Sequence, residues 1–125
     1  MAELDKKETN KFPKELHFGD VFITPYNNIN SRHVITDVGN GRVDKEGVPH
    51  FSAAEILNEK AGEETLALSG GHDIHDIGEI VDRWPLDKIL SAYRRSFQGV
   101  LSDKQANEVL KHTVGYSKKS SRKIF

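Results

Sequence analysis

The sequence predicts an α+β fold in which a small antiparallel sheet is followed by two helices near the C-terminus. Before Pro85, short β-branched and aromatic runs alternate with turn residues, which is typical of strands. After Pro85, apolar residues recur at helical spacing. Strands and helices are therefore segregated along the chain, which argues against an alternating βαβ unit with a parallel sheet.

Three short strands are expected in the first part of the chain. Residues 21–24 and 32–38 are rich in β-branched and aromatic groups, and the Asn-Gly turn at 40–41 favours a hairpin that returns through 42–44. This compact antiparallel pattern is similar to that of small SH3-like half-barrels, which we therefore expect as the form of the sheet.

A short helix is predicted next, followed by two further strands. Ser52 and Glu55 have the spacing of a capping box, and Phe51 and Ile56 fit an apolar staple, so the helix would run from Phe51 toward Gly62. The strands are expected at residues 65–68, which end at Gly70-Gly71, and at 77–84.

The C-terminal helices have the clearest pattern. Pro85 suits the first turn of a helix, and the next apolar residues all fall on one helical face: Leu86, Ile89, Leu90, Tyr93 and Phe97. A second capping box, Ser102 with Gln105, starts another helix that Gly115 is expected to end.

The chain of 125 residues fits one domain. We expect a flexible N-terminal arm (1–14), a single α+β domain (15–115) and a basic flexible tail (116–125). The absence of cysteine excludes disulfides and cysteine-ligated metal. No stretch resembles a signal peptide or a membrane span, so we expect a cytoplasmic protein without membrane contact.

Charge is distributed unevenly along the chain. Residues 1–90 contain 17 acidic and 10 basic side chains, whereas residues 91–125 contain 2 acidic and 8 basic ones, so charges of −7 and +6 make up the net −1. Such a basic end could contact phosphates, or it could dock on an acidic protein surface, either the acidic body of the same chain or that of a neighbour.

The densest group of polar candidates lies between Gly70 and Glu79. Two histidines and two aspartates fall within five residues, and in a helix His72, His75 and Asp76 would share one face. Imidazole and carboxylate together suit Zn, Mn or Fe, so these three are the candidate metal ligands. The alternative is a polar turn, in which the aspartates bind local backbone amides.

Part of this segment, His75-Asp76-Ile77-Gly78-Glu79-Ile80, resembles the His-Asp-Ile-Gly-Lys core of HD-type metal phosphohydrolases. The resemblance covers six residues and implies a helical site with a divalent metal. The chain departs from that pattern at Glu79, where the family has lysine, and in the glycines that flank the segment.

We expect a non-enzymatic binding module, of the kind found among bacterial or phage accessory factors, that acts through contact with a protein or with itself and needs no cofactor. Its expected contact residues are Tyr26, Arg32, His72 and His75. One alternative is nucleic-acid binding through the basic end, by Arg94, Arg95, Lys118 and Lys119. The other is a metal-dependent phosphohydrolase that uses the 72–76 segment.

Overall fold

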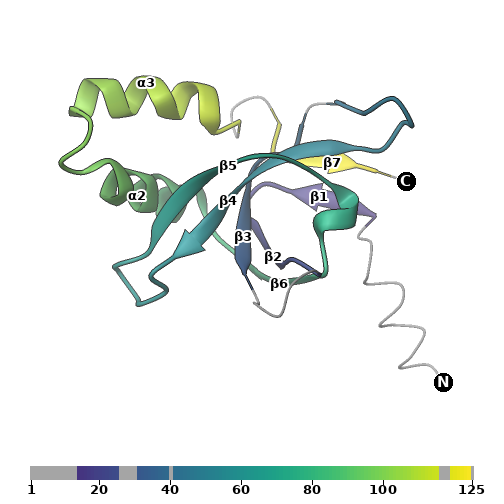
Figure 1. Ribbon diagram of the computed structural model, residues 1–125, viewed down its shortest axis with the longest axis horizontal. Helices are drawn as coiled ribbons and strands as arrows, with labels where there is room; N and C mark the ends of the chain where they lie inside the picture. Colours follow the sequence, from purple (N-terminus) through teal and green to yellow (C-terminus); the bar gives the residue numbers. More distant parts are fainter. Residues whose placement is uncertain (1–13, 26–30, 40, 116–118, 125) are drawn as a thin grey trace.

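The computed structural model describes residues 14–25, 31–39, 41–115 and 119–124, with the backbone alone at 68–70 (Figure 1). A five-stranded antiparallel sheet is followed in sequence by two helices, which confirms the α+β class. In chain order the elements are β1 Glu15–His17, β2 Asp20–Ile23, β3 Arg32–Asp37, β4 His50–Leu57, β5 Thr65–Asp73, the 3₁₀ turn η1 Ile74–Asp76, β6 Glu79–Arg83, α2 Leu86–Phe97, α3 Asp103–Thr113 and β7 Ser121–Lys123.

The strands of the main sheet lie in the order β5-β4-β3-β2-β6. Strands β2 to β5 are neighbours in sequence and in space, and the chain then passes through η1 and returns as β6 to pair with β2. Strands β1 and β7 form a separate pair, which lies at the opposite end of the molecule from α2 and α3 (Figure 1). The finer expectation of an SH3-like half-barrel stays a prediction.

Each face of the sheet carries its own apolar cluster, although the edge strand β6 is largely exposed. One cluster joins the sheet to the helices and includes Val34, Ala54 and Tyr93. The other lies on the opposite face and includes Ile35 and Ala53. Successive residues of β3 and β4 thus point into different clusters, as the alternation of side chains along a strand requires. Among the described residues, no helix has the length and apolar character needed to cross a membrane.

The predicted helix from Phe51 is wrong, because residues 50–57 form β4, a strand with neighbours on both sides. Its capping pattern and alanines are compatible with a helix, but pairing with β3 and β5 overrides that local preference. The strand predicted at 65–68 continues to Asp73 as β5, passing through the two glycines. The strand predicted at 42–44 is reduced to a single bridge between Val43 and Pro49.

The chain after residue 118 does not form the free basic tail that the sequence indicated. Residues 121–123 are β7, and Arg122 is buried. Its guanidinium donates hydrogen bonds to the carbonyl oxygens of His50 at 2.7 Å, Arg42 at 2.8 Å and Val38 at 3.3 Å. The last strand is therefore fastened to the main sheet by a side chain whose charge usually places it at the surface.

The two C-terminal helices are confirmed close to their predicted bounds. α2 begins directly after Pro85, and α3 begins at the Ser102–Gln105 capping box, both of whose hydrogen bonds are present. α2 packs on β5, and α3 lies alongside α2 (Figure 1).

Candidate functional site

The 72–76 segment joins the end of β5 to η1, and its aspartates accept backbone amides, as expected of a polar turn. The Asp73 carboxylate accepts the His75 amide at 2.8 Å, and the Asp76 carboxylate accepts the Asp73 amide at 3.0 Å, which together form a capping box. The helix that the HD-type resemblance implied is here a strand end and a single 3₁₀ turn.

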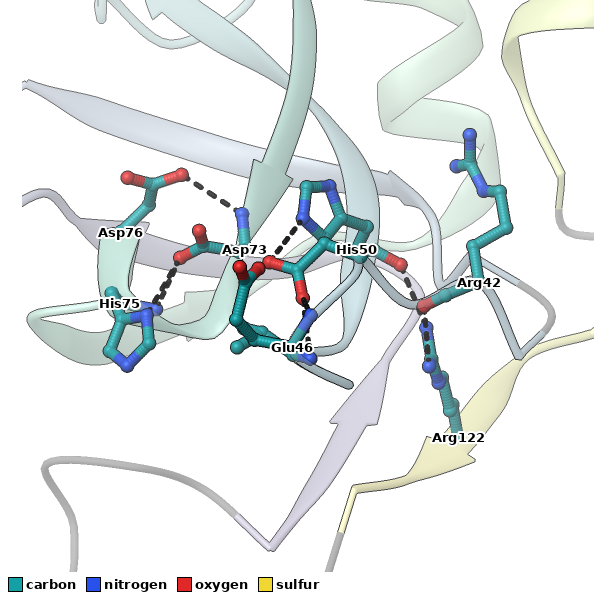
Figure 2. Close-up of polar contacts among 9 residues, drawn as sticks. Arg42, Glu46, His50, Asp73, His75, Asp76 and Arg122 are labelled. Atoms are coloured by element: carbon teal, nitrogen blue, oxygen red, sulfur yellow. Dashed lines mark hydrogen bonds and ion pairs between the residues drawn. The ribbon is translucent and has the colours of Figure 1, made fainter.

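The three predicted metal ligands do not share one contact. The Nδ1 atom of His72 lies 3.3 Å from Oδ2 of Asp76, whereas Nδ1 of His75 lies 3.3 Å from Oδ1 of Asp73. Figure 2 shows His75 turned toward Asp73, with Asp76 on the other side of that residue. The turn therefore brings His72 and Asp76 together and directs His75 elsewhere.

A different group of three converges nearby. Among the residues that the structure describes, only Asp44, His50 and Asp73 offer ligand atoms that all lie within 4.8 Å of one another. His50 begins β4 and faces Asp73 directly across the β4–β5 pairing (Figure 2), and Asp44 belongs to the turn before β4. All three side chains are half-buried.

Backbone contacts hold this group in place. The Asp44 carboxylate accepts the amides of Glu46 and Val48, both at 2.9 Å, and the bond from Val48 contributes most to lowering the pKa of Asp44 below its ordinary value. The His50 amide donates to the Arg42 carbonyl at 2.9 Å, and its carbonyl accepts from Arg122. Asp44 therefore stays ionised at neutral pH, and His50 is fixed on both sides of its backbone.

His33 and His72 form a pair of histidines in an aromatic environment. The rings of His33 and His72 are 5.3 Å apart, Phe22 stacks on His33, and Phe51 stacks on His72. Desolvation by burial lowers the pKa of both imidazoles, so both are neutral at pH 7. His33 is buried, and within the described part of the chain its Nδ1 atom has no hydrogen-bond partner.

The predicted contact residues are scattered, and several already have partners. Tyr26 and Lys118 lie outside the described residues. Arg32 forms an exposed ion pair with Glu59 at 3.6 Å. Arg95 donates to the carbonyl of Glu64, directly before β5, at 2.7 Å and so links α2 to the start of that strand.

Arg94 and Lys119 are exposed. Arg94 lines an open groove of about 710 Å³ between α2 and α3. Its walls are Leu86, Leu90, Arg94, Lys104, Asn107, Glu108, Leu110, Lys111 and Val114. Leu86 and Leu90 belong to the predicted apolar face of α2, and both are only partly buried. Their spacing predicts that they lie on one helical face. Nothing in the sequence indicates which residues of that face remain exposed in the folded protein.

Comparison of the chain with models of known protein families, with curated proteins and with solved structures finds no match.

Proposed function

We propose that this protein is a non-enzymatic binding module whose α2–α3 groove holds an acidic amphipathic helix of a partner protein. The observation that carries the proposal is the groove itself, about 710 Å³ in volume with an apolar floor and a basic rim. The proposal moves the expected contact from Tyr26, Arg32, His72 and His75 to the two C-terminal helices.

The floor of the groove supports a helical occupant. Leu86 and Leu90 are one turn apart on α2, and Leu110 and Val114 are one turn apart at the end of α3. Two such pairs on neighbouring helices leave an apolar channel, which is the surface that an amphipathic helix covers with residues at i, i+4 and i+7.

The rim supports an acidic occupant. Arg94, Lys104 and Lys111 line the groove against one acidic residue, Glu108, with which Lys111 pairs at 3.2 Å. Within the described part of the chain, Arg94 and Lys104 have no ion pair. Carboxylates beside an apolar helical stripe would meet these two charges, and such complementarity sets specificity and speeds association.

A protein partner suits this surface better than a nucleic acid does. Of the eight basic residues of the C-terminal end, Arg95 is engaged with Glu64, Lys111 with Glu108, and Arg122 with three carbonyl oxygens, which makes these three less available to a phosphate backbone. An apolar floor also offers nothing to phosphates. Nucleic-acid binding and the metal-dependent phosphohydrolase stay predictions.

The proposal is tested by selecting binders of the purified protein from a display library of amphipathic helical peptides in which every charged surface position of the peptide varies. We expect enriched peptides to carry leucine or phenylalanine at i, i+4 and i+7, flanked by glutamate or aspartate. The double variant R94E/K104E should weaken their binding about tenfold or more in fluorescence anisotropy. The control K60E/K123E reverses two exposed charges outside the groove and should leave binding unchanged.

Three results would contradict the proposal. One is enrichment of peptides without acidic residues, or of no peptide at all. The second is equal binding to the groove variant and the control. The third is tight, steeply salt-dependent binding of a duplex oligonucleotide that R94E/K104E abolishes, which would assign the groove to nucleic acid.

A further inference from the structure

Three side chains with metal-binding atoms meet near the start of β4, although they come from separate stretches of the chain. The β4–β5 register places His50 opposite Asp73. The bridge between Val43 and Pro49 folds the preceding turn back on itself, which brings Asp44 to the same place. The convergence therefore follows from strand pairing, and no local motif produces it.

Both carboxylates are already oriented by backbone amides. Oδ1 of Asp44 takes the amides of Glu46 and Val48, and Oδ2 faces Nε2 of His50 at 3.4 Å. Oδ1 of Asp73 takes the His75 amide. Hydrogen bonds of this kind orient the ligands of protein metal sites and limit their motion before the metal binds.

The spacing of the ligand atoms fits a small divalent cation. Ligand atoms about 2.1 Å from a tetrahedral ion lie about 3.4 Å from one another. The Asp44–His50 separation of 3.4 Å already has this value, and all three ligand atoms lie within 4.8 Å. Binding would need the widest gap to close by at most about 1.4 Å, which rotation of half-buried side chains can supply.

We propose that Asp44, His50 and Asp73 form a binding site for a divalent transition metal ion, with Zn²⁺ preferred to Mn²⁺ and Mg²⁺ disfavoured. One imidazole and two carboxylates suit Zn²⁺ and Mn²⁺, and the usual order of affinities places Zn²⁺ above Mn²⁺. Three protein ligands leave at least one coordination position for water or for an anionic group of a partner. The site is separate from the α2–α3 groove, so the two proposals are independent.

The bound ion would join the 42–49 turn to the β4–β5 edge. In the metal-free protein the contact between Asp44 and His50 is a half-exposed hydrogen bond. A metal ion that replaces the proton of this hydrogen bond would also bind Asp73 and so link the end of β5 to the turn. Hydrogen exchange of the Glu46 and Val48 amides should therefore slow when metal binds.

Isothermal titration of EDTA-treated protein with ZnCl₂, MnCl₂ and MgCl₂ tests the site. We expect one saturable Zn²⁺ site per chain, weaker Mn²⁺ binding and no saturable Mg²⁺ binding. D44N, H50Q and D73N should each weaken Zn²⁺ binding about tenfold or more. The asparagine side chains keep an oxygen for the backbone amides, and circular dichroism in EDTA identifies any variant that does not fold.

The matched control is H112Q, which alters an exposed histidine in the last turn of α3 and leaves the three proposed ligands intact. H112Q should bind Zn²⁺ as the unmodified protein does. Absence of saturable Zn²⁺ binding, equal loss in H112Q and H50Q, or Mg²⁺ binding as tight as Zn²⁺ binding would each overturn the proposal.

Discussion

The burial of Arg122 predicts that a single substitution in the last strand destabilises the whole domain. Its guanidinium serves three carbonyl oxygens, of which that of Val38 is fully buried and those of Arg42 and His50 are partly exposed. Arg122→Met keeps the length of the side chain but removes all three donors. A lost hydrogen bond to a charged group costs about 1.5–3 kcal/mol, less where water can replace the donor. About 2 kcal/mol for the buried bond to Val38 and about 0.5 kcal/mol for each of the two partly exposed bonds give an expected loss of about 3 kcal/mol.

Urea unfolding followed by far-UV circular dichroism and Trp84 fluorescence measures this loss. Against a typical total of about 5–15 kcal/mol, 3 kcal/mol is a large fraction and corresponds to a fall in Tm of roughly 10 °C. The control is Lys123→Met in the same strand, where the side chain is exposed and the change should stay within about 0.5 kcal/mol. If the two variants are equally stable, the three bonds to Arg122 do not hold β7 and the reasoning is wrong.

Three further predictions follow from buried groups. Burial lowers the pKa of His33 and His72, so below about pH 6.5 the unfolded chain binds more protons than the folded one. The free energy of unfolding should therefore fall as the pH drops from 7 toward 5. In urea titrations at several pH values, the double variant H33Q/H72Q should show a weaker dependence on pH. Gly39 has a φ of +90°, and a Cβ there would overlap the His50 carbonyl oxygen, so Gly39→Ala should lower the free energy of unfolding by more than the roughly 1 kcal/mol of backbone strain alone, which thermal unfolding detects as a lower Tm. The Tyr93 hydroxyl is buried near Thr36 without a well-formed hydrogen bond among the described residues, and burial raises its pKa to about 12, so Tyr93→Phe should be nearly neutral in thermal unfolding.

The sequence predicted the helices correctly because caps and apolar spacing, which specify a helix, involve residues only a few positions apart. The Ser102–Gln105 box and the apolar stripe after Pro85 gave α3 and α2 because caps and helical spacing act within a few residues. The same reasoning misassigned Phe51, since the pairing that makes β4 a strand comes from residues distant in sequence. Strand pairing overrides the local preference where a segment has a paired strand on each side.

The candidate sites were harder to predict for the same reason. The dense 72–76 segment drew attention to adjacent residues, whereas Asp44, His50 and Asp73 meet only once the register between β4 and β5 is known. Arg122 offers a similar case, because a basic residue in a polar stretch indicates an exposed tail and only tertiary structure reveals its acceptors.

The pairing of β1 with β7 has a consequence for how this chain can be cut and rejoined. Glu15 lies opposite Lys123, and the Ile124 amide donates to the Lys14 carbonyl at 3.0 Å, so a short linker could connect the two strands. New ends could then be opened at Gly99, whose neighbourhood in the α2–α3 connection is open to solvent. A circular permutant of that kind would keep every strand pairing while separating the two walls of the groove in sequence.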